Sequence, residues 1–235
     1  MTSRVAVLAS GRGSNLRSLL EHLERQGLSA PAQVILVLSD HPDAGALSLA
    51  KEFSSGIATI TIQAGSDHGA AVVDLLQTHA IDLIVLAGFL KLVPGQVVTA
   101  YRGRIINVHP ALLPSFGGQG MYGARVHRAV LGSGARVSGA TVHFVDDSYD
   151  RGAIIAQWPV PVFEDDTEKT LAARVLRAEH ALLPRVVCEL AKSRVRLQGD
   201  HATGFFASGN EDAAFTLHER APGELGSDID AALAR

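Results

Sequence analysis

Short, wholly apolar segments alternate with segments of helical periodicity over residues 5–108, and this pattern constrains the fold more than any other feature of the chain. Strands that are apolar on both faces are typical of a parallel sheet covered on both sides. The intervening segments carry apolar residues three and four positions apart, which predicts helices. We therefore expect an α/β fold with a Rossmann-like, mostly parallel sheet and helices on both faces. The expected strands are residues 5–9, 34–38, 57–62, 83–87 and 104–108.

The rhythm changes in the second half of the chain. Residues 139–145 and 154–162 have the composition of two more strands, and we expect them to pair antiparallel around the loop between them. A long helix is expected to begin after Thr167, a residue suited to an N-cap. Pro184 is expected to kink or split that helix.

The composition is that of an ordinary globular protein, with 47% hydrophobic and 19% charged residues in a chain of 235. We predict a single domain over residues 1–198. Residues 199–235 are acidic, rich in glycine and weakly periodic, so we expect them to form a partly ordered C-terminal tail.

Charge, cysteine content and hydropathy exclude several classes of function. The net charge of −3 argues against nucleic acid or an anionic membrane as a partner. The single Cys188 rules out an intramolecular disulfide framework and fits a reducing compartment. The longest apolar stretch, residues 83–90, is too short to cross a membrane. We expect a cytoplasmic protein without a metal, because the histidines show no metal-ligand spacing such as H-E-x-x-H.

A glycine-rich segment, Ser10–Asn15, stands between the first expected strand and the first expected helix. Glycines there let backbone N–H groups approach an anion, and the helix N-terminus favours negative charge. Ser14 or Asn15 suits the N-cap of that helix. A tight turn without a ligand fits the same residues. Leu16 stands where a dinucleotide fingerprint requires glycine, although Asp40 could still serve as its ribose-binding acid, so a dinucleotide-binding oxidoreductase stays as an alternative.

A second set of polar residues ends the fifth expected strand. Residues two apart on a strand share a face, so Asn107 and His109 project together. An amide donor and a group that titrates near neutral pH suit an oxyanion and a proton transfer. A hydrogen-bonded pair that only closes the strand is the structural alternative. The loop that follows, residues 110–123, is long enough to suggest a functional role.

Three acids lie in the loop between the last two expected strands: Asp146, Asp147 and Asp150. Acids clustered in a turn are usually solvated turn formers. One that reached His109 would favour the charged imidazolium.

With these segments in this order, the chain resembles the phosphoribosylglycinamide formyltransferases, a folate-dependent family, over about residues 3–198. The resemblance rests on Ser10–Leu16, Leu86–Lys91, Ile106–Pro114, Gly139–Asp147 and Glu179–His180. It implies transfer of a formyl group from 10-formyltetrahydrofolate, as cosubstrate, to the amine of glycinamide ribonucleotide in purine synthesis. Formyltetrahydrofolate hydrolases resemble the same family and stay as an alternative.

The resemblance also implies roles for individual residues. The catalytic set carried over by position is Asn107, His109 and Asp147. The remaining positions are Gly13, Ser14 and Asn15 for the ribonucleotide phosphate, Glu179 for its ribose, and Leu90, Lys91, Leu92, Val93 and Asn107 for the folate. We expect small-molecule partners only, the ribonucleotide and the folate, and a monomer or homodimer.

Three local features accompany the resemblance. The family's Leu-Pro bond, here Leu113–Pro114, is typically cis. Residues 117–123 replace a shorter stretch common in the family, so we expect the loop near the folate to differ. His68 is the nearest counterpart of an arginine that many members place before their third helix.

Overall fold

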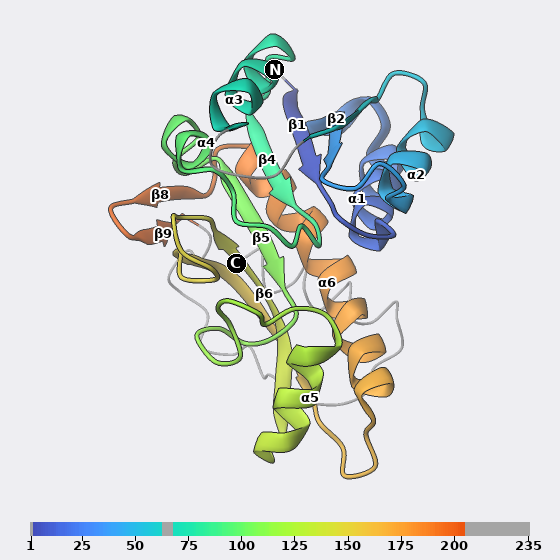
Figure 1. The fold of residues 1–235 in the computed structure, drawn as a ribbon, viewed down its shortest axis with the longest axis vertical. Coiled ribbons are helices and arrows are strands. Elements are labelled where there is room, and N and C mark those ends of the chain that lie inside the picture. The colour runs from blue at the N-terminus through green and yellow to red at the C-terminus, as the bar shows by residue number, and fades with distance from the viewer. Residues whose placement is uncertain (1, 63–67, 205–235) are drawn as a thin grey trace. The chain divides into compact units, whose positions relative to one another are not determined.

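The structure is a computed structural model that describes residues 2–62 and 68–204 (Figure 1). The chain divides into two compact units, each considered separately. The first holds the residues up to Asn107 together with Phe144–Gly152, and the second holds Val108–His143 and the residues from Ala153 onward.

The first unit carries a parallel sheet. Its strands are β1 (Ser3–Leu8), β2 (Ala32–Ser39), β3 (Ala58–Thr61), β4 (Leu83–Leu86) and β5 (Ile105–His109), the last of which runs just past the boundary. They pair in the order β3-β2-β1-β4-β5, every pair parallel. The chain therefore reverses its direction across the sheet between β1 and β4, which is where open α/β sheets bind ligands.

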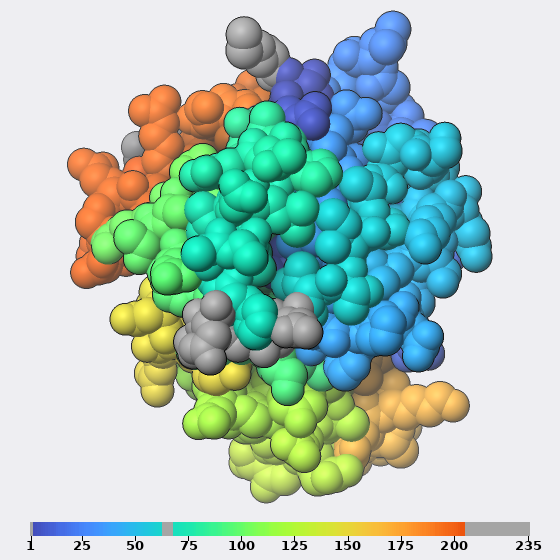
Figure 2. Space-filling view, turned by 45° about the horizontal axis from the view of Figure 1, so that its top comes forward, coloured from blue at the N-terminus to red at the C-terminus, as the bar shows by residue number. Residues whose placement is uncertain are grey.

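Helices cover both faces of this sheet. They are α1 (Ser14–Gln26), α2 (Gly45–Phe53), α3 (Gly69–Thr78) and α4 (Gly95–Ala100), with a 3₁₀ turn, η1 (Gly27–Ser29), after α1. Figure 1 shows α1 and α2 on one side of the strands and α3 and α4 on the other. Figure 2 shows the surface of α3, in teal, on the outside of this unit. This confirms the expected mostly parallel α/β fold.

The core follows from the apolar runs. Val5, Ala6, Val7 and Ala9 are each 0% exposed, as expected for a strand buried on both faces. On the face of α3 and α4, alternate residues of the strands pack with the apolar stripes of those helices. The members of this cluster include Ala6, Leu8, Leu36, Leu38, Val72, Leu76, Ile84, Leu86, Val97 and Ile105.

The second unit is built on a helix and an antiparallel pair. Its elements are α5 (Ala124–Ser133), β6 (Val137–Phe144), β7 (Ile154–Pro161), α6 (Glu168–Ala191), β8 (Arg196–Gln198) and β9 (His201–Thr203). β6 and β7 pair antiparallel, as expected, and β8 and β9 form a short hairpin. The boundary expected after residue 198 falls in the turn of this hairpin, and residues 205–235 of the expected tail lie outside the described residues.

α6 starts as the sequence predicts but does not break at its proline. Thr167 is the N-cap, and its hydroxyl accepts a hydrogen bond from the Thr170 N–H while the Thr170 hydroxyl accepts one from the Thr167 N–H. The helix runs through Pro184 without being split. Proline removes one backbone donor, but Leu182, Leu183 and Val186 around it are buried, and their packing holds the helix together.

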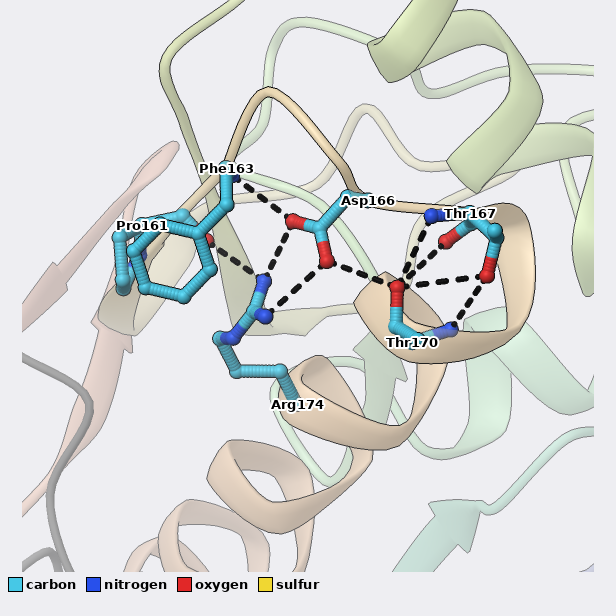
Figure 3. Close-up of polar contacts among 6 residues, drawn as sticks. All are labelled: Pro161, Phe163, Asp166, Thr167, Thr170 and Arg174. Atoms are coloured by element: carbon cyan, nitrogen blue, oxygen red, sulfur yellow. Dashed lines mark hydrogen bonds and ion pairs between the residues drawn. The ribbon is translucent and has the colours of Figure 1, made fainter.

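A buried ion pair fixes the loop that leads into α6 (Figure 3). Arg174 donates from Nη1 to Oδ2 of Asp166 at 2.6 Å and from Nη2 to Oδ1 at 3.0 Å. The Phe163 N–H and the Thr170 hydroxyl also donate to this carboxylate, and the Arg174 guanidinium lies 4.3 Å from the Phe163 ring centroid. The Arg174 hydrogen bonds, with smaller contributions from the other donors, lower the pKa of Asp166 from 3.8 to about 2 despite its burial.

This pair predicts an acid-sensitive stability. Because the folded-state pKa lies below the unfolded one, Asp166 stabilises the fold above about pH 4 and loses this effect as the pH falls toward 2. The shift corresponds to about 2 kcal/mol. We expect Asp166→Asn to lower the free energy of unfolding by at least that much at pH 7, since it leaves Arg174 buried without its counter-ion.

Urea denaturation of wild type and Asp166→Asn at pH 7 and at several values from pH 4 down to pH 2 checks this. The variant should lose less stability than wild type over the acid range. Glu164→Gln, which removes an ion pair with Arg136 whose side chains are 68% and 86% exposed, serves as the control and should behave as wild type. Equal acid dependence in Asp166→Asn and wild type would rule out the assignment.

Candidate functional site

The glycine-rich loop between β1 and α1 is packed backbone to backbone against the start of α2. The Ala46 N–H donates to the Gly11 carbonyl at 3.1 Å. Gly13 has a left-handed backbone with φ of 82°, and a Cβ there would lie 2.9 Å from Cα of Ala46. Glycine at position 13 is therefore required by the turn itself.

Helix α1 begins without a side-chain cap. Gly13 is its N-cap, Ser14 is its first helical residue, and the Arg17 N–H makes the first helical hydrogen bond, to the Gly13 carbonyl at 2.9 Å. The expected cap by Ser14 or Asn15 is therefore wrong, because the left-handed turn at Gly13 starts the helix one residue earlier. The first-turn N–H groups of a helix have no acceptor within the helix, so they could donate hydrogen bonds to an anion at this end of the sheet.

The segment after β4 lies beside this loop. Ser10 joins the two, since its N–H donates to the Gly88 carbonyl at 3.1 Å and its hydroxyl accepts from the Leu90 N–H at 3.1 Å. Leu90 and Leu92, two residues apart, are 43% and 44% exposed, so this segment offers apolar surface that a ligand could contact.

The other two residues expected to bind the folate differ from each other. Lys91 is exposed. Val93 is 3% exposed and packs in the core cluster under α4. Within the first unit the structure thus brings the expected phosphate loop and the expected folate segment together at the carboxyl ends of β1 and β4.

Asn107, which lies in β5 level with the last residue of β4, contacts a carboxylate of the same unit. Its Nδ2 donates to Oδ1 of Asp150 at 3.3 Å. The loop that carries Asp150 starts alongside β5, where the Val145 N–H donates to the Ile105 carbonyl at 2.9 Å. It closes at Gly152, where a Cβ would collide with the Phe144 carbonyl oxygen. This closure turns the chain back, so that Asp150 takes a left-handed backbone with φ of 54°.

The other two acids of the loop accept hydrogen bonds from Ser148 in the same loop. Oδ1 of Asp146 accepts from the Ser148 N–H at 2.9 Å, and Oδ1 of the exposed Asp147 accepts from the Ser148 hydroxyl at 3.2 Å. Of the three acids, Asp150 is thus the one shown at Asn107. The residues alone grouped the three acids without choosing among them, and the resemblance implied Asp147. The glycine two residues after Asp150 was the available sign of the closure.

In the second unit, His109 is 3% exposed and its Nε2 lies 2.9 Å from the carbonyl oxygen of Phe116. The Leu113–Pro114 bond in the intervening loop is cis, as the resemblance implies. Glu179, expected at the ribose, is 7% exposed on the inner face of α6. His68, the expected counterpart of the family's arginine, belongs to the described residues and is the exposed N-cap of α3.

A second buried imidazole, His127 of α5, was not singled out by the sequence. It is 5% exposed, and its Nδ1 has no hydrogen-bond partner among the residues that the structure describes. Burial lowers the pKa of His127, His109 lowers it further, and Glu168 opposes the shift. Only its place in the apolar stripe of α5 could have pointed to it.

Residues 2–62 and 68–204 contain no group of three or more histidine, cysteine, aspartate or glutamate side chains placed to hold a metal ion. Over the same residues, no helix is both long and apolar enough to cross a membrane.

Comparison with known proteins agrees with this arrangement. The family model described as "Formyl transferase" matches residues 3–187. The chain is 40% identical over 203 residues to the chloroplastic phosphoribosylglycinamide formyltransferase of Arabidopsis thaliana, covering 84% of this chain and 68% of that protein. It is 42% identical to the protein of the same name from Vigna unguiculata, covering 82% of this chain but only 62% of the relative.

Solved structures show the same fold. The glycinamide ribonucleotide transformylase 1 of Symbiobacterium toebii superposes with a TM-score of 0.77 at 36% identity, covering 86% of this chain and 93% of that one. The family match spans both the glycine-rich loop and the strand that carries Asn107 and His109. The chain therefore belongs to the formyl transferase family.

Proposed function

We propose that the chain transfers the formyl group of 10-formyltetrahydrofolate to the amine of glycinamide ribonucleotide. The observation that carries the proposal is the Asn107–Asp150 pair at the carboxyl end of β5, on the sheet edge that also holds the glycine-rich loop and the exposed Leu90 and Leu92. Ligands of open α/β sheets bind at this edge. The names of the plant and bacterial relatives supply the acceptor, and the resemblance to the family supplies the folate as formyl donor.

The reaction needs donors for a developing negative charge. The amine nitrogen attacks the formyl carbon, the carbonyl oxygen becomes an oxyanion, and the bond to the folate nitrogen then breaks. Asn107 donates from Nδ2 to the oxyanion. Protonated His109 donates to it as well and supplies the proton that the departing folate nitrogen takes up, while the amine gives up one proton. No net proton is gained or lost.

Asp150 sets which end of the Asn107 amide serves the reaction. A carboxylate only accepts hydrogen bonds, so Nδ2 rather than Oδ1 must face Asp150. An amide NH₂ has two hydrogens, so the same nitrogen can donate both to Asp150 and to the oxyanion. We therefore propose Asp150 for the supporting role. The resemblance implies Asp147 instead, and asparagine substitutions at the two positions distinguish the two assignments.

For the ribonucleotide, the proposal places the phosphate at the N–H groups of Gly13, Ser14 and Asn15, and the ribose at Glu179. For the folate it retains Leu90, Lys91, Leu92 and Val93, together with Asn107. The dinucleotide alternative gains no support, since the side chain of Asp40 is 4% exposed, beside His41, and is closed to a ribose hydroxyl.

The phosphate loop can be tested at Gly11, because a Cβ there would meet no atom within 4 Å. We expect Gly11→Val to leave the Tm unchanged and to raise the KM for the ribonucleotide about tenfold or more, since the side chain fills space that the phosphate needs. The KM for the folate should change little. Steady-state kinetics with each substrate varied in turn checks this.

Gly13→Ala is the matched structural control. Its Cβ would press on Ala46, and its φ of 82° disfavours a side chain, so it should lower the Tm. If the loop were only a tight turn, Gly11→Val would leave both KM values unchanged.

A further inference from the structure

The loop that follows His109 returns to the histidine, and its carbonyl at Phe116 contacts the imidazole. We propose that this carbonyl fixes the protonation of His109, so that Nε2 keeps its hydrogen throughout and Nδ1 is the nitrogen that gains and loses the proton. The inference deepens the proposed function and rests on it for the part that His109 plays. Phe116 is thereby a positioning residue that acts through its backbone.

The contact itself decides the tautomer. A peptide carbonyl can only accept a hydrogen bond, and its oxygen lies 2.9 Å from Nε2 of His109. Nε2 must therefore carry a hydrogen in the neutral ring as well as in the charged one. The ring is 3% exposed, so bulk water does not compete for this bond. A partner of this kind on one ring nitrogen sets the role of the other.

The backbone of Phe116 is bent to make the contact. Its φ of 58° lies in the left-handed region, which is unusual for a residue with a large side chain. Such conformations persist where the surroundings over-determine them and are concentrated at functional sites. Left-handed glycines follow at positions 118 and 120, within the stretch that departs from the family pattern.

The start of the loop is held just as firmly. The Thr141 hydroxyl, on β6, donates to the Ala111 carbonyl at 2.6 Å and accepts from the Leu113 N–H at 3.1 Å. Gln157, on β7, donates from Nε2 to the Leu113 carbonyl at 2.8 Å and to the Thr141 hydroxyl at 3.0 Å. Thr141 is 0% exposed, and its hydroxyl has its one donor and both acceptor sites in use. The segment between His109 and Phe116 is thus fixed at both ends.

This assignment gives the proton a defined path. With Nε2–H committed to Phe116, protonated His109 releases the Nδ1 proton to the departing folate nitrogen and recovers one from the amine that has attacked. The ring returns to its starting state without turning over. A ring free to exchange tautomers would lose that orientation and with it part of the rate.

Nitrogen-15 NMR of the wild-type protein labelled at histidine tests the tautomer without any assay of activity. The spectrum is recorded at a pH at which His109 is neutral, and His109→Gln assigns its signals. We expect the hydrogen on Nε2. A hydrogen on Nδ1 in the neutral ring would overturn the inference. If the wild type transferred no formyl group, the proposed function would fail while this result still stood.

Two substitutions at Phe116 test the backbone. Phe116→Val and Phe116→Asn both remove the ring, but asparagine tolerates a left-handed backbone and valine does not. We expect Phe116→Val to lower kcat by about 10- to 100-fold with both KM values little changed, and Phe116→Asn to stay close to wild type. Equal losses in the two variants at matched Tm would show that the ring, rather than the carbonyl, matters and would overturn the inference.

Discussion

Asn107→Ala and His109→Ala are each expected to lower kcat by at least about 10²- to 10³-fold, the typical effect of removing one donor to an oxyanion. Asn107 carries an amide N–H at the end of β5, and His109 adds a second donor that can also move a proton. Each loss should fall on kcat rather than on KM, because the charge that these groups stabilise develops only as the amine attacks.

Single-turnover kinetics with both substrates saturating measures this effect, and far-UV circular dichroism with the Tm checks the fold. His201→Ala, an exposed histidine of the β8–β9 hairpin, is the control and should behave as wild type. Near wild-type turnover in both alanine variants would remove the assignment of the site to the end of β5.

Asp150→Asn is expected to lower kcat by at least about a hundredfold, whereas Asp147→Asn should leave it nearly unchanged. Asparagine at position 150 tolerates the left-handed backbone, so the loop should keep its shape. It replaces a carboxylate, which can only accept a hydrogen bond, by an amide that can either accept or donate, so Nδ2 of Asn107 is no longer the only atom of its amide that can face position 150. Within this turn, Asp147 accepts a hydrogen bond from the hydroxyl of the neighbouring Ser148.

The two substitutions lie three positions apart in one loop and make the same chemical change, so each serves as the control for the other. Parallel measurement of kcat and of both KM values separates them. A large loss in Asp147→Asn with little loss in Asp150→Asn would restore the acid implied by the resemblance and contradict the supporting role of Asp150.

Much of the fold could be predicted because it follows from the local order of apolar and polar residues along the chain. The segment Val5–Ala9 is apolar at every position, which is typical of a strand buried on both faces, and all five residues are buried. The N-cap at Thr167 could also be predicted from the local sequence, because a hydroxyl just before a helix can accept a hydrogen bond from a backbone N–H of the first turn. Pro184 shows the limit of such reasoning, because the packing of α6 outweighs the local preference.

The contacts within the candidate site could not be predicted from the sequence and required the three-dimensional structure. Three acids within five residues look alike in a sequence, and which one returns to Asn107 depends on the closure of the loop between Phe144 and Gly152. The same holds for Phe116, whose carbonyl reaches His109 only through a left-handed bend that its residue type disfavours. The order β3-β2-β1-β4-β5 likewise depends on long-range pairing that no local pattern contains.

The identity of the formyl acceptor can be tested directly in one assay. Purified protein is given 10-formyltetrahydrofolate with glycinamide ribonucleotide present in one reaction and omitted from the other, and the free folate, the formylated ribonucleotide and formate are all quantified. We expect the folate to lose its formyl group only when the ribonucleotide is present, with one formylated ribonucleotide formed per folate released. Release of formate at the same rate in both reactions would contradict it and indicate a hydrolase.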